Sequence, residues 1–314
     1  MLKAVQNFNH FGRNFTKYRS MSKHAVLDFH LSDVQSIIPQ LTSKQHKGEA
    51  GRIGIIGGSR EYTGAPYFSA MTALRLGADL AHVFCSQDAG TAIKCYSPDL
   101  IVHPILNDSD AFEQLENWLQ RLHVVVIGPG LGRDDTTVEL SYRIIQKLKS
   151  SGVTTIIDAD GLHVLTKFPD LMENFSTAVV TPNEIEFQRL CSAVSIEIDE
   201  DADFNFSQRF KNVTVVRKGA VDKIFNSEFK TVAIGGSNRR CGGQGDILSG
   251  AIAVFSHWAE ISKNEHKTLL AGYGACRFTK KLNEVAFVEN DRGMITNDMV
   301  AKIPSVFKQL FEEV

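Results

Sequence analysis

The chain has 314 residues, of which 43% are hydrophobic and 22% are charged, a balance typical of a globular protein with a sizeable core. A formal net charge of −2 provides no basic field across the molecule, which argues against a protein that binds nucleic acid by neutralising its phosphates. Its 24 glycines and 8 prolines are too few for a collagen-like or disordered chain.

Five cysteines are scattered through the chain, at positions 85, 95, 191, 241 and 276, and none belongs to a Cys-x-x-Cys pair. The sequence also lacks a His-Glu-x-x-His motif, so it argues against both a disulfide scaffold and a zinc site. The thiols are expected to stay reduced inside a cell. No apolar stretch approaches the ~20 residues that span a bilayer, and no membrane partner is expected.

The first 27 residues contain no acidic side chain, whereas their basic residues are interspersed with hydroxyl residues. This composition is typical of a mitochondrial transit segment, and a disordered basic tail is the alternative. Initiation at Met21 would remove most of the basic segment, so mitochondrial and cytoplasmic products are both expected.

From residue 52 onward, apolar runs alternate with stretches of helical period. Strands are predicted at residues 52–57, 80–85, 100–104, 123–128, 154–158, 177–181, 213–217, 223–225 and 231–234. Helices are predicted at residues 65–76, 111–122, 136–150, 184–191, 245–259 and 265–282. Most strand runs are apolar throughout, as in parallel strands covered on both faces.

This alternation predicts a three-layer α/β/α sandwich around a mostly parallel sheet, in one domain over residues 28–314. Ligands of such sheets bind beyond the carboxyl ends of the strands. The loops that directly follow predicted strands are therefore the candidate site.

A glycine-rich loop, Gly128-Pro129-Gly130-Leu131-Gly132-Arg133, follows the strand at 123–128. Arg133 stands where a Rossmann Gly-x-Gly-x-x-Gly motif needs its last glycine, which weakens dinucleotide binding in the Rossmann manner. The glycines instead favour a substrate that lies against the backbone.

Asn183 and Glu186 lie three residues apart at a predicted helix start. Their oxygens suit Mg²⁺, directly or through bound water, and a simply capped helix is the alternative. Lys218 and Gly219 directly follow the strand at 213–217, where they suit nucleotide contacts or form a charged hairpin turn.

Gly242-Gly243-Gln244-Gly245-Asp246 leads directly into a helix. Glycines allow a close approach of a ligand, and the free amides of a helix start attract anions. The Asp246 carboxylate either caps the helix or accepts a proton from a hydroxyl group.

Gly243-Gln244-Gly245-Asp246 resembles the Gly-x-Gly-Asp signature of the ribokinase-like superfamily. With Arg239 and Arg240 before it, the string is more specifically similar to ATP-dependent NAD(P)H-hydrate dehydratases, which restore hydrated NADH and NADPH. Further similar strings are Tyr62-Thr63-Gly64-Ala65-Pro66, the loop at 128–133, Asp158-Ala159-Asp160-Gly161-Leu162 and the stretch from Asn183. They occur in family order over most of the chain.

The resemblance implies a ribokinase-like fold, ATP as co-substrate, Mg²⁺ as cofactor, and an Asp246 that acts as catalytic base beside the anion hole of Gly243 and Gly245. It implies that Mg²⁺ is held by Asn183 and Glu186. The implied contacts of the hydrated dinucleotide are Tyr62, Ala65, Gly130, Asn183, Glu184, Ile185, Glu186, Phe187, Gln188, Arg189 and Asp246. The implied contacts of ATP are Lys218, Gly219, Ala220, Val221, Asp222, Gly236, Ser237, Asn238, Arg239, Arg240, Cys241, Gly242, Gly243, Gln244 and Gly245.

Alternatives remain for some residue roles and for the function itself. Tyr62 is either a substrate contact or a core aromatic, and the acids Asp158 and Asp160 are expected to cap a helix rather than to arrange metal and phosphates. The rival functions are a ribokinase-like kinase of a vitamin-precursor alcohol and a catalytically dead nucleotide-binding regulator. The partners expected are small molecules, and the sequence leaves association into a homo-oligomer open.

Overall fold

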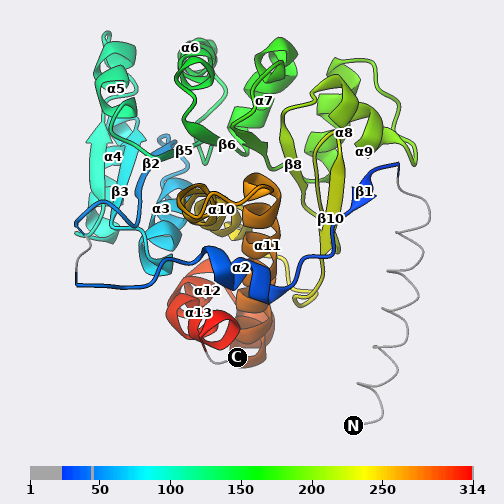
Figure 1. Cartoon of the computed structure of the whole chain (residues 1–314). Coiled ribbons are helices and arrows are strands. Elements are labelled where there is room, and N and C mark those ends of the chain that lie inside the picture. Colours follow the sequence, from blue (N-terminus) through cyan, green and yellow to red (C-terminus); the bar gives the residue numbers. More distant parts are fainter. Residues whose placement is uncertain (1–22, 44–45, 313–314) are drawn as a thin grey trace.

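One twisted sheet organises the computed structural model, which describes residues 23–43 and 46–312 (Figure 1). Within these residues ten strands form the sheet, in the order β1-β10-β9-β8-β7-β6-β5-β2-β3-β4. Their bounds are β1 (Ala25–Val26), β2 (Arg52–Ile56), β3 (Leu80–Cys85), β4 (Ile101–Pro104), β5 (Val124–Ile127), β6 (Thr154–Ile157), β7 (Ala178–Val180), β8 (Thr214–Arg217), β9 (Asp222–Phe225) and β10 (Phe229–Ala233). Neighbours from β4 to β8 are parallel, and β9 runs antiparallel to both β8 and β10.

Helices cover both faces of this sheet, and their apolar sides meet two separate core clusters. Their bounds are α2 (Leu31–Ile37), α3 (Gly64–Leu76), α4 (Gln87–Tyr96), α5 (Ala111–Leu119), α6 (Asp135–Ser151), α7 (Asp160–Lys167), α8 (Glu184–Ala193), α9 (Ala202–Arg209), α10 (Gln244–Ile261), α11 (Lys267–Asn290), α12 (Thr296–Ala301) and α13 (Ile303–Phe311), with 3₁₀ turns at Pro169–Met172 and Asp291–Gly293. Figure 1 shows α5 to α9 along one face and α3, α10 and α11 along the other, with α2, α12 and α13 beyond them.

The strands supply side chains to both clusters because successive residues of a strand point to opposite faces. In β5, Val124 and Val126 pack into one cluster, whereas Val125 and Ile127 pack into the other. All four are buried, which explains why the run is apolar throughout.

The predicted fold class is confirmed: the sheet is mostly parallel and lies between two helical layers. Each predicted strand and helix is present, with bounds that differ by a few residues; the largest shift is at the end of α11. β1 and several helices, most of them short, were not predicted from the sequence. α4 begins at a serine cap, Ser86, that the analysis did not use.

The basic segment expected at residues 1–27 lies mostly outside the described residues. Within it, Ala25–Val26 forms β1, which pairs with the edge strand β10. No helix in the described ranges is both long and apolar enough to cross a membrane.

Candidate active site

The order of the strands predicts a ligand site beyond the carboxyl ends of β2 and β5. β3 and β4 add to one side of β2, whereas β5, β6, β7 and β8 add in turn to its other side, so the direction of the strand order reverses at β2. In open α/β sheets, ligands bind beyond the carboxyl ends of the strands at such a switch point. The loops here carry Gly57 and Pro129, and a Cβ on Gly57 would lie only 2.1 Å from the Pro129 carbonyl oxygen. The two loops are therefore in close backbone contact.

The loop after β5 brings together three of the predicted substrate contacts. Gly130 has a φ of +60°, and a Cβ there would lie 2.7 Å from the Tyr62 Cβ and 3.3 Å from the Ala65 Cβ. Tyr62 is 62% exposed, so it is not a core aromatic. The structure thus brings Tyr62, Ala65 and Gly130 together in the loops that follow β2 and β5.

The acids after β6 do not cap a helix as expected. The cap position of α7 is Ala159, which has a φ of +46° and provides no side-chain capping bond. Asp160 instead accepts hydrogen bonds from the Gly132 amide (3.0 Å) and from Arg133 Nε (2.6 Å). Asp158 is buried and accepts a bond of 2.8 Å from Lys218 Nζ. A non-glycine residue at positive φ is strained, which is common where side chains are arranged for function.

Asp246 lies in the first turn of α10, whose cap residue is Gly243 at a φ of +93°. In the part of the chain that the structure describes, no capping hydrogen bond to the Asp246 carboxylate is found, so the alternative role as a helix cap is not what the structure shows. Burial, together with the charges of Asp158 and Asp160, raises the pKa of Asp246 well above its usual value, although Lys218 lowers it. A carboxylate of raised pKa without a capping role suits proton acceptance.

Lys218 is the cation at the centre of the site. Its ammonium lies 2.8 Å from Asp158 Oδ1 and 3.8 Å from Glu186 Oε2. A Cβ on Gly245 would lie 3.5 Å from Lys218 Nζ, so the amides of α10 begin beside this cation. Burial alone would lower the pKa of Lys218, but Asp158, Glu186 and Asp246 raise it, and the side chain stays charged.

A cleft opens from Lys218 over the start of α10. Eight of the predicted ATP contacts line it: Lys218, Gly219, Asp222, Gly236, Ser237, Arg240, Gln244 and Gly245. The others belong to the same two loops but do not line it: Ala220, Val221, Asn238, Arg239, Cys241, Gly242 and Gly243. Residues 218–221 connect antiparallel strands, so the hairpin turn and the ligand cleft are one feature.

The sequence analysis missed the wall that α11 contributes to this cleft, with Lys280 and Asn283. Asn283 accepts a bond of 2.5 Å from the Ser237 amide and donates one of 3.0 Å to the Arg239 carbonyl. Lys280 pairs with the buried Asp222 at 3.2 Å. Both side chains continue the buried stripe of α11, and polar residues at helical spacing within such a stripe are the signal that could have found them.

The start of α8 carries the predicted stretch from Asn183 to Arg189. Asn183 and Glu186 form a reciprocal capping box, with Asn183 Oδ1 accepting from the Glu186 amide at 2.9 Å and Glu186 Oε2 accepting from the Asn183 amide at 2.8 Å. Ile185, Gln188 and Arg189 are exposed. Phe187 is fully buried in the core, where it has no surface open to a ligand.

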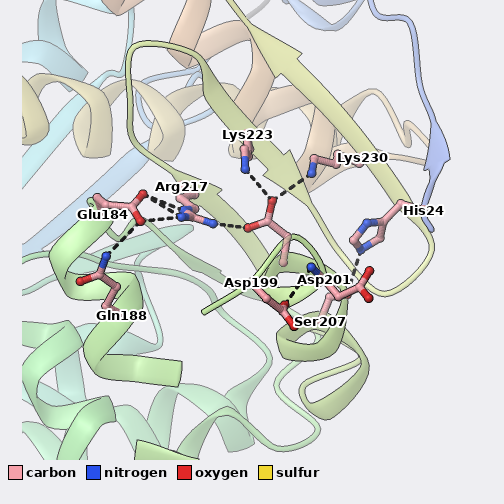
Figure 2. A network of polar contacts seen from close by, with 10 residues as sticks. His24, Glu184, Gln188, Asp199, Asp201, Ser207, Arg217, Lys223 and Lys230 are labelled. Atoms are coloured by element: carbon pink, nitrogen blue, oxygen red, sulfur yellow. Dashed lines mark hydrogen bonds and ion pairs between the residues drawn. The ribbon is translucent and has the colours of Figure 1, made fainter. Parts of the chain in front are cut away.

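Glu184, one of the implied contacts of the hydrated dinucleotide, pairs with Arg217 and anchors α8 to β8. Arg217 Nη2 lies 2.7 Å from Glu184 Oε1, and Arg217 Nη1 lies 2.5 Å from the buried Asp203 (Figure 2). Asp203 also forms ion pairs with Lys223 and Lys230. Burial raises the pKa of Asp203, but these cations outweigh burial and lower the pKa to about 2. Because Arg217 directly precedes Lys218, this network fixes the strand end that presents the central cation.

The comparisons with known proteins agree with this geometry. A model of the family described as NAD(P)H-hydrate dehydratase matches residues 53–305. The chain belongs to that family. The resemblance inferred from the motifs is therefore confirmed.

Curated relatives of this dehydratase family match the chain along almost its whole length. The chain is 47% identical over 303 residues to the ATP-dependent (S)-NAD(P)H-hydrate dehydratase of Bos taurus, with 92% of each chain covered. It is 45% identical over 303 residues to the enzyme of that name from Homo sapiens, with 92% of this chain and 87% of the relative covered.

Solved structures share the fold of the dehydratase chain at low sequence identity. A ribokinase-like superfamily protein from Enterococcus faecalis has a TM-score of 0.76 at 23% identity, covering 91% of this chain and 96% of that one. The ADP/ATP-dependent NAD(P)H-hydrate dehydratase of Bacillus subtilis, co-crystallised with ATP/Mg²⁺, has a TM-score of 0.70 at 17% identity, covering 92% and 99%.

Proposed function

We propose that this chain is an ATP-dependent NAD(P)H-hydrate dehydratase, which returns the (S)-hydrated forms of NADH and NADPH to the parent coenzymes and yields ADP and phosphate. One observation carries the proposal: Asp246, a carboxyl group of raised pKa, lies in the first turn of α10, directly after two residues that line the cleft beside Lys218. Family membership and the names of the relatives support it.

Hydroxide is a poor leaving group from the hydrated nicotinamide ring, whereas phosphate is a good one, so phosphorylation of the ring hydroxyl makes its elimination possible. Asp246 takes the proton of the ring hydroxyl, whose oxygen attacks the terminal phosphorus of ATP and displaces ADP. The bond between ring carbon and phosphate oxygen then breaks, the neighbouring carbon loses a proton, and the conjugated ring returns. Lys218 and the amides from Gly243 to Asp246 stabilise the negative charge of the moving phosphoryl group.

Mg²⁺ fits this site on charge and donor type. The single ammonium of Lys218 faces the carboxylates of Asp158, Glu186 and Asp246, and bound phosphates would add further negative charge. Mg²⁺ takes one or two protein carboxylates together with substrate phosphates, so Asp158 and Glu186 would hold it. The capping box uses only one carboxylate oxygen of Glu186, whereas it uses the single side-chain oxygen of Asn183. When bound, it would neutralise phosphate charge. No group of three or more His, Cys, Asp or Glu placed for a metal occurs among the described residues.

The test is a recovery assay at the absorbance band of the reduced nicotinamide ring, with hydrated NADH and ATP, ADP or no nucleotide. We expect recovery with ATP and release of inorganic phosphate. A stable phosphorylated alcohol without recovery would instead identify a kinase, and no turnover of ATP would identify a nucleotide-binding regulator.

We infer from composition that residues 1–27 direct one product to mitochondria, while a product that starts at Met21 stays in the cytoplasm. A fusion of residues 1–27 to a fluorescent reporter should colocalise with mitochondria, and a fusion that begins at Met21 should not. A purely cytosolic signal from the first fusion would contradict the inference.

A further inference from the structure

A second cleft, of about 660 Å³, lies beyond the carboxyl ends of β2, β3, β4 and β5, on the far side of the Gly130 loop from the nucleotide cleft. Its lining comes from the residues that follow these four strands and from the first turns of α6. None of the predicted site residues lines it.

The lining joins an apolar wall to a set of hydroxyl and amide groups. Leu131, Leu140 and Ile144 form part of the wall, and Ser59 and Asn107 are among the polar groups. The Ser59 hydroxyl is buried, and no hydrogen-bond partner for it is found in the ranges that the structure describes. A buried hydroxyl without a partner is costly, so a ligand that bonds to it would be favoured.

The charged groups on the rim are mostly acidic. Glu61, Asp88 and Asp134 line the cleft against one cation, Arg60. Hydrogen bonds from Thr137 hold the pKa of Asp134 below its usual value, so this carboxylate stays ionised and can only accept hydrogen bonds. This rim favours neutral ligands with hydroxyl donors and disfavours anions.

The Gly130 loop borders the cleft, because Leu131 lines it and Gly132 lies beside two further lining residues. A Cβ on Gly132 would lie 3.9 Å from the Ser59 Cβ and 3.7 Å from Asp134 Oδ2. Because Gly132 has no side chain, only its backbone lies between the Gly130 loop and the cleft. Gly130, two residues away, contacts Tyr62. A substrate on the Gly130 loop would therefore extend into this cleft at its other end.

We propose that this cleft binds the adenosine end of the hydrated dinucleotide, and that its carboxylates favour the substrate with a free ribose 2′-hydroxyl over the one with a 2′-phosphate. The inference rests on the proposed function. An apolar wall suits the adenine ring, and a carboxylate that accepts a bond from the 2′-hydroxyl repels a 2′-phosphate.

The first experiment compares kcat/KM for hydrated NADH and hydrated NADPH. Wild type should prefer hydrated NADH, and Asp88→Asn and Asp134→Asn should each reduce this preference by about two- to fivefold, the range of single exposed charge pairs. Asparagine keeps the helix cap that Asp134 provides. Glu139→Gln, an exposed acid of α6 outside the cleft, is the matched control and should change nothing. Preference for hydrated NADPH in wild type, or an unchanged ratio in both variants, would overturn the inference.

The second experiment needs no turnover. With the nucleotide cleft saturated by a non-hydrolysable ATP analogue, calorimetry measures binding of adenosine, the neutral end of the dinucleotide, to the full chain. Asn107→Trp fills the cleft from an exposed loop position and should weaken binding at least tenfold, whereas Ser109→Trp, exposed and outside the cleft, should not. Thermal melting confirms that both variants fold. Equal binding by both variants refutes the cleft, whereas cleft-dependent binding without turnover of either hydrate refutes the proposed function alone.

Discussion

Replacing the proposed base, Asp246→Asn, keeps the size of the side chain and removes its ability to accept a proton at neutral pH. General-base loss typically costs ~10²–10⁴ in rate, so we expect kcat to fall by about that factor. ATP affinity should change little, because the lining of the cleft beside Lys218 is untouched. In wild type, kcat should fall as pH decreases through the raised pKa of Asp246, because only the ionised carboxylate accepts the proton.

The same variant should not lose stability. No capping bond from Asp246 is found in the described part of the chain, so asparagine removes none. Because burial raises the pKa of Asp246 on folding, the folded state binds the proton more tightly than the unfolded state. Its ionised form therefore lowers stability at neutral pH, and this penalty vanishes below the usual carboxyl pKa, where both states are protonated.

We therefore expect Asp246→Asn to melt at the wild-type temperature or above it at neutral pH, with the difference lost in acid. Steady-state kinetics with hydrated NADH and thermal melting at two pH values measure both effects. A folded variant that keeps more than about a tenth of wild-type kcat would refute the role of Asp246 as base. A lower melting temperature at neutral pH would refute the electrostatic argument.

Three further substitutions test the surroundings of the site. Lys218→Met leaves the buried Asp158 carboxylate without its cation, which should lower the free energy of unfolding in urea by about 3–5 kcal/mol. The same variant should move the acid limb of the kcat–pH profile to higher pH, because the charge that lowers the pKa of Asp246 is gone. Gly130→Ala should raise KM for the hydrated dinucleotide but not for ATP, whereas Gly152→Ala, at a similar φ of +71° with open space around it, should change stability alone. Asn283→Ala should raise KM for ATP severalfold and leave KM for the hydrated dinucleotide unchanged, and the reverse pattern would place this side chain elsewhere.

The strands and the position of the site could be predicted from the sequence because each depends on local signals. A run such as Val124–Ile127 is apolar throughout only if both faces are covered, which already implies a parallel sheet between helices. Parallel strands bring their following loops to one edge, so motifs distant in sequence had to converge. The loops of Gly130 and Asp246 were predicted to belong to one site on this ground, together with the family resemblance.

What the sequence analysis missed depends on contacts between distant segments. The backbone at Ala159 adopts a positive φ that no local signal predicts, and it turns Asp158 and Asp160 to other segments instead of the helix start. Asn283 bonds to loop residues more than forty positions away, and only the packing of α11 beside the sheet brings it there. Local patterns report periodicity and turns, not such partners.

Main-chain contacts fix the Gly130 loop, whereas side-chain hydrogen bonds from α11 hold the nucleotide cleft. This difference determines how well each tolerates substitution. The loop of Gly130 is fixed by backbone that leaves no room for a side chain, so any larger residue must displace main-chain atoms. The nucleotide cleft rests on side chains of α11, where Asn283 and Lys280 bond to the backbone of two loops. Losing such a bond costs about 1–3 kcal/mol when its partner stays buried, and a side chain of similar shape recovers part of it. A clash with main chain has no comparable relief, so the geometry constrains the substrate loop more tightly than the nucleotide cleft.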